Sequence, residues 1–456
     1  MVTSLEYDSK PDFLWPAFSR MKHPLYTSTS KVFVRGKGTQ LFDESGKGYY
    51  DGFSTLWTNL VGHGREEIIA AMTEQMHKLS FMHLFTGSTH QPAHELSEIL
   101  IESSPFKHKH CVFGLSGSDA TETAIKLARA YWWGQGRPQK NIIVGRLSEY
   151  HGTSLGALSL MGQDDYQIPY SPLVSRTHRV PPPNCYRCPW KLDFRTCNVE
   201  CKNAFDEYFE NINAKENVAA ILIEPIITSD GLIPPPKGYW EHIQKVCREN
   251  EVLIVADEVS TGMGRTGTLY GSTQFGLQPD ICYLAKSLTS GYAPLSVVTT
   301  SKEIFDVLNS NGKYFSHGTT FGGHPTSCIA AIKTFEILFK ENLVEASSRL
   351  GKALDETLTH ELEGLEHVGS IRGAGTLFEI ELVQNKNTKL PPRRETELGM
   401  LLYRDLLDQG QYVRVLGRFL CIAPPLVSTV DEVIQMAKAI RCSIERLTTN
   451  RSLWFG

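Results

Sequence analysis

Short apolar runs alternate with amphipathic stretches along the middle of the chain. Thr121–Trp132 and Tyr239–Glu249 have the spacing of apolar residues that is typical of helices. The runs between such stretches are short and partly β-branched, as in strands buried on both faces of a sheet. These runs are Val112–Leu115, Ile142–Gly145, Ala219–Glu224 and Val252–Asp257. Because strands alternate with helices where a parallel sheet is covered on both faces, the pattern predicts a central α/β domain.

The two ends of the chain follow a different pattern. Residues 31–53 alternate apolar and polar positions around glycine-containing turns, which predicts a small antiparallel meander. Beyond residue 325 we expect a long helical region, two strand regions and a closing helix. The last three are expected at Thr376–Leu382, Tyr412–Ala423 and Val430–Leu447. We assign a large domain to residues 65–325, and a smaller α+β domain that both termini build to residues 1–64 and 326–456.

Composition narrows the class of protein without identifying it. The 456 residues are 41% hydrophobic and 21% charged, which is ordinary for a globular chain. A net charge of −4 gives no electrostatic reason to expect nucleic acid or an anionic membrane as the main partner. The sequence has no apolar run of bilayer-spanning length and no secretory signal pattern at its start, so we expect a cytoplasmic protein.

Charged side chains follow two of the apolar runs. Asp257 and Glu258 end one run, and functional residues gather at the carboxyl ends of parallel strands. Lys286 follows another apolar run, and a desolvated lysine has a lowered pKa that suits Schiff-base chemistry. Ordinary alternatives exist, because carboxylates also cap helices or bind metals, and a lysine at a strand end can extend to solvent.

Three glycine-rich or polar segments complete the candidate chemistry. In residues 114–130 a strand runs into a turn with Gly117 and Ser118 and then a helix, and helix N-termini bind phosphate. Residues 314–325 contain hydroxyls and glycines that could form a second phosphate contact. Tyr150 could stack on a flat heteroaromatic ring, with a tight turn at His151. Taken singly, these segments are equally typical of a capped helix, a glycine-rich loop and core-edge residues.

The order and spacing of these motifs decide between the alternatives. S-G-S, Y-H-G, I-E-P, D-E-V, G-M-G-R-T-G, A-K-S and T-F-G-G occur in this order. From roughly His23 to the C-terminus the chain resembles the class III aminotransferases, and among these the amine:pyruvate or ω-transaminase group. The resemblance implies an α/β fold of fold type I, with a mainly parallel central sheet in the large domain, and pyridoxal 5′-phosphate (PLP) as the cofactor.

The resemblance also implies a role for each matching residue. Lys286 would hold PLP as a Schiff base and shuttle a proton, and Asp257 would pair with the pyridine nitrogen. The other implied cofactor contacts are Gly117, Ser118, the Asp119 amide, Tyr150, His151, Glu224, Val259 and Thr320. Thr320 would reach the phosphate of a partner subunit, which implies an obligate homodimer with a shared site, and dimers could pair into tetramers.

The resemblance implies fewer residues for the substrate than for the cofactor. Trp57, Phe85 and Tyr150 match positions that wall the substrate pocket, and Arg414 matches an arginine that pairs with a substrate carboxylate. The implied reaction moves an amino group from a primary amine to a keto acid, with pyruvate expected, through pyridoxamine phosphate. Two other hypotheses are an aminomutase or decarboxylase with the same cofactor, and a non-enzymatic or metal-dependent α/β protein in which the lysine is incidental.

Cys185, Cys188, Cys197 and Cys201 form a cluster in the sequence. Four thiolates with such spacing could hold a structural zinc ion. The segment does not match the iron–sulfur motifs of some members of this enzyme class. Reduced thiols and one or two disulfides are the other possibilities, and all of these alternatives stay open. We expect no metal in the active site itself.

Overall fold

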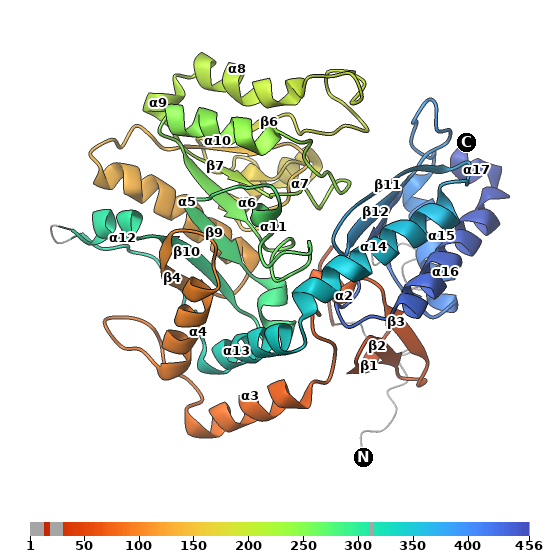
Figure 1. Cartoon of the computed structure of the whole chain (residues 1–456), viewed down its shortest axis with the longest axis horizontal. Coiled ribbons are helices and arrows are strands. Elements are labelled where there is room, and N and C mark those ends of the chain that lie inside the picture. The colour runs from red at the N-terminus through yellow and green to blue at the C-terminus, as the bar shows by residue number, and fades with distance from the viewer. Residues whose placement is uncertain (1–12, 19–30, 311–312, 456) are drawn as a thin grey trace.

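The computed structural model describes residues 13–18, 31–310 and 313–455 (Figure 1). The start of the resemblance at His23 and much of the predicted N-terminal part of the small domain lie outside the described residues. The helices are α2 Ser54–Trp57, α3 Glu66–Lys78, α4 Gln91–Glu102, α5 Gly117–Gly134, α6 Leu155–Leu160, α7 Asp164–Gln167, α8 Asn203–Asn211, α9 Ala214–Asn217, α10 Tyr239–Glu249, α11 Gly271–Gln274, α12 Lys302–Asn309, α13 Pro325–Lys340, α14 Leu343–Leu362, α15 Glu395–Asp408, α16 Val430–Thr448 and α17 Arg451–Trp454.

A large mixed sheet forms the centre of the molecule. Within the described residues it has seven strands in the order β4-β10-β9-β8-β7-β5-β6. The bounds are β4 His108–Gly114, β5 Ile142–Arg146, β6 Thr177–Val180, β7 Val218–Ile223, β8 Leu253–Asp257, β9 Ile281–Leu284 and β10 Ser296–Ser301. The strands from β9 to β6 are parallel, whereas β10 is antiparallel to both β4 and β9. The prediction of a mainly parallel sheet is therefore confirmed, with β10 as the exception.

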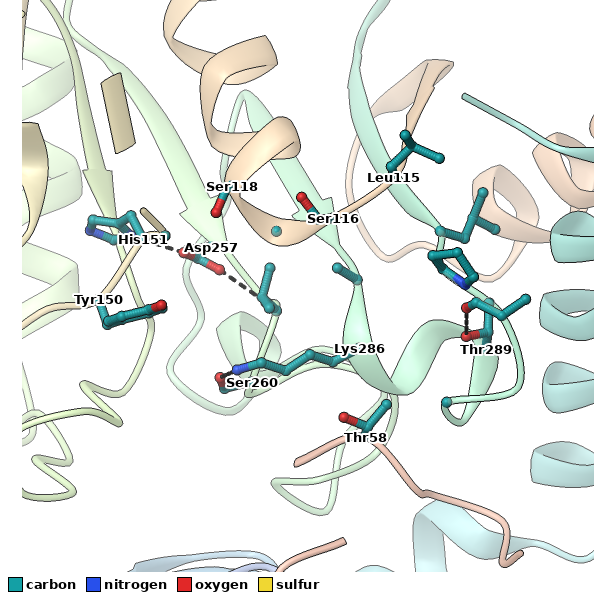
Figure 2. A pocket seen from close by; sticks show the side chains of 18 residues that line it. Thr58, Leu115, Ser116, Ser118, Tyr150, His151, Asp257, Ser260, Lys286 and Thr289 are labelled. Atoms are coloured by element: carbon teal, nitrogen blue, oxygen red, sulfur yellow. Dashed lines mark hydrogen bonds and ion pairs between the residues drawn. The ribbon is translucent and has the colours of Figure 1, made fainter. Parts of the chain in front are cut away.

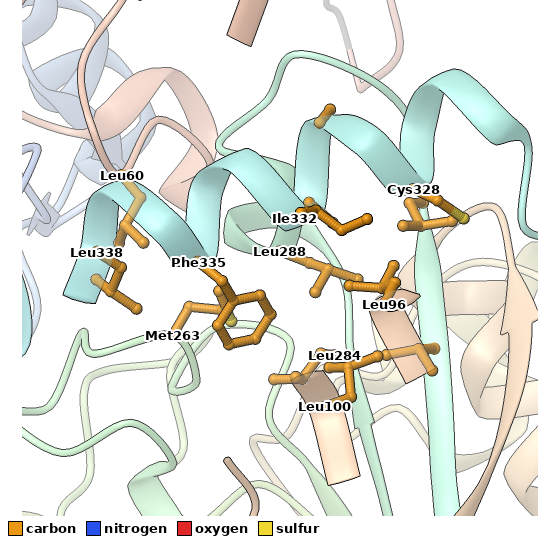
Figure 3. Close-up of a cluster of buried hydrophobic side chains, with 14 of the residues drawn as sticks. Leu60, Leu96, Leu100, Met263, Leu284, Leu288, Cys328, Ile332, Phe335 and Leu338 are labelled. Carbon is orange, nitrogen blue, oxygen red and sulfur yellow. The ribbon is translucent and has the colours of Figure 1, made fainter. Parts of the chain in front are cut away.

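Helices cover both faces of this sheet, as the alternation of patterns predicted. On β7, Leu222 packs in the cluster beneath α5 and α12, while Ile221 and Ile223 pack in the cluster beneath α8 and α10. A third cluster lies where α4 and α13 pack together (Figure 3). It contains Leu284 and Leu288, which flank the segment that carries Lys286. This segment is thereby fixed to the core on both sides.

The N-terminal meander and the C-terminal part of the chain share a sheet. The meander consists of β1 Phe33–Lys37, β2 Gln40–Asp43 and β3 Gly48–Asp51, and β13 Gln411–Tyr412 pairs in parallel with β3. An antiparallel sheet of β11 Val368–Ala374, β12 Leu377–Leu382, β15 Phe419–Ile422 and β14 Arg414–Leu416 packs against α14, α15 and α16. These pairings agree with a small domain from both termini, although the exact domain boundaries stay a prediction.

Two expectations for the C-terminal region need correction. The stretch Tyr412–Ala423 is not one strand, because a turn at Gly417, with φ +57°, separates β14 from β15. The strand β11 was not predicted. Only its first and last residues are buried, so its sequence lacks the continuous apolar run of a buried strand. Within the residues that the structure describes, no helix is both long and apolar enough to cross a membrane.

Candidate active site

The carboxyl ends of the parallel strands meet at a cavity of about 370 Å³ (Figure 2). Asp257 ends β8, Lys286 follows β9 just after its last residue, and Tyr150 and His151 lie beyond β5. The lining residues are Thr58, Leu115, Ser116, Gly117, Ser118, Tyr150, His151, Gly152, Asp257, Val259, Ser260, Ala285, Lys286, Thr289, Gly291, Ala293, Pro294 and Leu295. Side chains that are far apart in the sequence thus converge where parallel sheets place their ligands.

The N-terminus of α5 opens into this cavity. Ser116 caps the helix, because its hydroxyl accepts a hydrogen bond from the Asp119 amide at 3.3 Å. A Cβ on Gly117 would lie 3.3 Å from the Val259 side chain, so glycine leaves room between the helix end and β8. Gly152 has φ +119°, and a Cβ there would lie 2.2 Å from the Ser118 hydroxyl. The result is a narrow polar cradle of the kind that binds anions.

Lys286 lies in the cavity with its amine held by two groups. Its Nζ donates a hydrogen bond to Ser260 Oγ at 2.8 Å and stands 4.7 Å from the centre of the Trp57 ring. Burial lowers the pKa of Lys286 to about 8, although Asp257 and Glu224 oppose this shift. The backbone of Lys286 is in the left-handed region, with φ +41°, a conformation that costs energy for a residue with a side chain. The side chain of Lys286 thus points into the cavity, where it is half-buried, and its amine is bound to Ser260.

Asp257 is buried, and hydrogen-bond donors orient its carboxylate. Its Oδ2 pairs with His151 Nδ1 at 2.8 Å, and its Oδ1 accepts the Val259 amide at 3.0 Å. Glu224 lies behind Tyr150, where its Oε1 accepts the Tyr150 amide at 3.1 Å. Burial, followed by the charge of Asp257, raises the pKa of Glu224 to about 7. The carboxyl group of Glu224 is thus poised between its charged and neutral forms near neutral pH.

An aromatic wall with a cation lies beside the cavity. The rings of Phe53 and Trp57 are 4.3 Å apart, and the Arg414 guanidinium lies 5.6 and 5.5 Å from their centres. Arg414 Nε is buried and has no hydrogen-bond partner among the described residues. The segment before Trp57 is strained, with positive φ at Ser54 and Thr55. The Asp51 carboxylate holds it by accepting the Thr55 amide at 2.6 Å.

The structure brings together only some of the residues that the sequence analysis selected. Gly117, Ser118, Tyr150, His151, Asp257, Val259 and Lys286 line the cavity. The Asp119 amide instead serves the helix cap, and the Asp119 carboxylate accepts the Leu115 amide at 2.8 Å. Thr320 and Phe85 are exposed and do not line the cavity. They belong to neighbouring loops, since a Cβ on Gly318 would lie 3.1 Å from the Phe85 ring.

Four polar residues of the cavity, Thr58, Ser116, Ser260 and Thr289, were not selected from the sequence. Ser116 is the helix cap, and it could have been found as the serine that precedes Gly117 at the predicted helix start. Ser260 holds the lysine amine but is separated from Lys286 by 26 positions. Its only signal in the sequence is a hydroxyl three residues after Asp257, which is common in any loop.

The cysteine cluster lies away from this cavity. Cys185, Cys188, Cys197 and Cys201 line a second, much smaller cavity of about 20 Å³. All four are free thiols, and burial with the neighbouring thiols raises the pKa of Cys201 to about 12. The described residues contain no group of three or more His, Cys, Asp or Glu side chains arranged to hold a metal ion. In this structure the cluster is a set of four separate thiols.

Comparisons with known proteins agree with this geometry. A family profile described as Aminotransferase class-III matches residues 23–444. The chain is 33% identical to the adenosylmethionine-8-amino-7-oxononanoate aminotransferase of Geobacter sulfurreducens, over 95% of this chain and 96% of the relative. It is 34% identical to the putrescine–pyruvate aminotransferase of Pseudomonas aeruginosa, over 93% and 95%. A crystal structure of a PLP-bound amine transaminase from an uncultivated Pseudomonas species superposes with a TM-score of 0.92 at 31% identity, over 96% and 99%.

Proposed function

This chain belongs to the class III aminotransferases, which depend on PLP, and we propose that it moves an amino group from a primary amine without an α-carboxylate to a keto acid, with pyruvate as the acceptor. The relatives are named for different donors and acceptors. Their similarity to this chain therefore supports the transfer of an amino group, and it does not choose among substrates. The proposal of an amine donor therefore rests on the side chains around the cavity.

The residues of the cavity fit the cofactor. A cradle in which a Cβ on Gly152 would clash with Ser118, and one on Gly117 would press against Val259, lies at the N-terminus of α5, where a phosphate is favoured by free amides and the helix dipole. Asp257 offers a buried carboxylate to a pyridinium nitrogen, and Lys286 offers an amine of lowered pKa to an aldehyde. The cavity thus offers the three groups that PLP requires: amide donors for the phosphate, a carboxylate for the pyridinium nitrogen and an amine for the aldehyde.

Bound PLP acts as the electron sink for the carbanion that forms at the substrate carbon. Asp257, Tyr150 and Val259 all line the cavity; Asp257 would keep a proton on the pyridine nitrogen, and Tyr150 and Val259 would pack against the ring. Lys286 Nζ removes the proton from the substrate carbon and later returns one. Ser260 Oγ, which lies 2.8 Å from that Nζ, holds the amine in place between these transfers.

The observation that carries the proposed substrates is the position of Arg414. Its guanidinium lies between 5 and 6 Å from two aromatic rings, and its Nε has no partner among the described residues. A guanidinium whose Nε has no partner among the described residues can donate to the carboxylate of a keto acid. The rings of Phe53 and Trp57 offer an apolar surface to an amine that carries no carboxylate. One pocket can thus accept both substrates in turn.

We further propose that two copies of the chain complete each other's sites. Thr320 and Phe85 are exposed on loops outside their own cavity, and the Phe85 ring lies close to Gly318, two residues before Thr320. A second copy that covers these loops would place the Thr320 hydroxyl near a phosphate and the Phe85 ring near the substrate. Sedimentation of the holoenzyme tests this assembly, and a monomer with full activity would overturn it.

The proposed reaction is tested with purified holoenzyme and a panel of diamines, ω-amino acids and aryl amines, each with pyruvate. We expect alanine to form with at least one amine donor, in an amount equal to the donor consumed. Lys286→Ala is the control and should form no alanine. Absence of alanine across the panel would refute the proposal, and turnover of a donor without any keto acid would indicate a mutase or decarboxylase instead.

A further inference from the structure

A line of buried charges lies behind Asp257, on the side away from the cavity. Arg146 is the last residue of β5 and is 1% exposed, and Glu149 is fully buried. Arg146 donates to Glu149 Oε1 at 2.6 Å through Nη2 and at 3.1 Å through Nε, and its guanidinium also contacts the Glu224 carbonyl. Glu149 in addition accepts the Glu224 amide at 2.6 Å. Neither residue of this pair lines the cavity.

His151 lies between this pair and Asp257. Its Nδ1 is 2.8 Å from Asp257 Oδ2, and its Nε2 is 3.6 Å from Glu149 Oε2. Nε2 is buried and has no closer partner among the described residues. If His151 were neutral, one of its ring nitrogens would present a lone pair to a carboxylate, which is repulsive. If both nitrogens carry protons, each faces an anion, so the geometry favours the imidazolium form.

We propose that Arg146 and Glu149 are positioning residues which hold His151 as an imidazolium, and that this cation keeps Asp257 ionised and oriented toward the cavity. The proposal rests on the proposed role of Asp257 as the partner of the pyridine nitrogen. Charges then alternate from Arg146 through Glu149 and His151 to Asp257, and a protonated pyridine would extend the alternation. Each anion in the line has a cation on either side.

The surrounding charges explain why such a line is needed. Asp257, Glu224 and Glu149 are all buried, so this part of the site concentrates negative charge away from solvent. Burial alone would lower the pKa of His151, but its hydrogen bond to Asp257 and the nearby charge of Glu149 raise that pKa to about 10. Lys286 also faces Asp257 and Glu224, but its own lowered pKa makes it a weaker counter-charge near pH 8. An imidazolium that lies between two carboxylates is thus the steadier partner for Asp257.

A variant that removes the charge of Glu149 but keeps its size tests whether Glu149 acts on His151 by its charge or only by packing. In Glu149→Gln the imidazolium loses one of its two anions, so His151 should become neutral and Asp257 should gain a proton. A neutral Asp257 pairs poorly with a pyridinium nitrogen, so PLP should bind at least about tenfold more weakly, by analogy with metals whose ligands lose the groups that orient them. Glu258→Gln is the matched control, because Glu258 is as buried and adjacent to Asp257 but bonds instead to Thr261 and Ser272.

The experiment uses apoenzyme with ¹⁵N-labelled histidine, and the His151 signals are assigned by their loss in His151→Asn. The wild type and Glu258→Gln should show two protonated ring nitrogens from pH 6 to 9, whereas Glu149→Gln should show one. PLP titration of the same samples, followed by absorbance, should reveal weaker binding in Glu149→Gln alone. A neutral His151 in the wild type would overturn the proposal, even if Glu149→Gln failed to fold.

Equal PLP affinity in Glu149→Gln and wild type would also overturn it. The outcome is independent of the substrates, because both readouts need neither an amine donor nor a keto acid. A chain that fails the donor panel but holds His151 as an imidazolium would therefore refute the proposed reaction and leave this inference intact.

Discussion

The Lys286 amine of the apoenzyme is expected to be uncharged, and so reactive, far more often near neutral pH than an ordinary lysine. Burial lowers its pKa from 10.5 to about 8. At pH 7 roughly one lysine in eleven would then be uncharged, against about three in ten thousand at the ordinary value, a difference of roughly 300-fold. The charged groups that face this amine are Asp257 and Glu224, which raise the pKa, and Arg414 and Arg265, which lower it.

Variants of the facing charges should move this pKa in opposite directions. Arg414→Met removes a cation, so protonation of Lys286 becomes easier and its pKa should rise. Glu224→Gln removes an anion, so its pKa should fall further. The shift also affects stability, because the folded apoenzyme binds fewer protons than the unfolded chain between pH 8 and 10.5. Burial of the charged amine thus costs about 3 kcal/mol below pH 8, and this cost disappears as the pH rises through that window.

Competitive acetylation measures the pKa of this amine directly. Apoenzyme is treated with trace acetic anhydride at a series of pH values, and peptides that carry Lys286 and the exposed Lys352 are quantified by mass spectrometry. The ratio of the two should rise with a midpoint near pH 8 for Lys286 in the wild type. A midpoint at the ordinary lysine value, or shifts of the same sign in Arg414→Met and Glu224→Gln, would refute the reasoning.

Three further predictions follow from the same geometry. Arg414→Met should raise KM for pyruvate by at least about tenfold, because a charge-assisted hydrogen bond of about 1.5–3 kcal/mol is lost. The KM for an apolar amine should stay nearly unchanged. Arg418→Met is the control and should change neither KM, because the Arg418 guanidinium binds Glu395 and Glu381. Gly152→Ala should weaken PLP binding because its Cβ would displace Ser118, whereas Gly136→Ala, also at positive φ but with open space, should not; equal PLP affinities would contradict this. Leu96→Ala, in the fully buried cluster beneath Lys286, should lower the free energy of unfolding by about 2–5 kcal/mol, and a loss below 1 kcal/mol in denaturant titration would contradict the packing.

The sequence predicted the strands whose ends build the site, because continuous burial leaves a clear apolar pattern. All six residues of β7 are buried, and β8 was predicted within one residue. An apolar run does not show in which direction its strand lies in the sheet. The antiparallel orientation of β10 therefore could not be predicted from its residues. For the same reason a stretch such as Tyr412–Ala423 reads as one strand, although a glycine turn folds it back on itself.

The residues of the candidate site also fall into those that the sequence could predict and those that it could not. Lys286, Asp257 and the turn at Gly117 could be predicted, because each follows a strand and together they match a family pattern. Ser260 could not, since its role depends on a contact across 26 positions that no local pattern encodes. Arg146 and Glu149 were also missed, because their charges lie at the end of an apolar strand and only the fold shows that they face each other rather than solvent.

Asp257 connects the two ends of the proposed chemistry. Its charge raises the pKa of Lys286 in the cavity and the pKa of His151 behind it. A change at Asp257 should therefore disturb both groups, whereas a change at Glu149 acts on His151 directly and on Lys286 only through Asp257. If Glu149→Gln neutralises Asp257, Lys286 should lose a facing anion and its acetylation midpoint should fall below that of the wild type. Agreement between the histidine signals and this midpoint would show that the buried line of charges and the lysine act on one carboxylate.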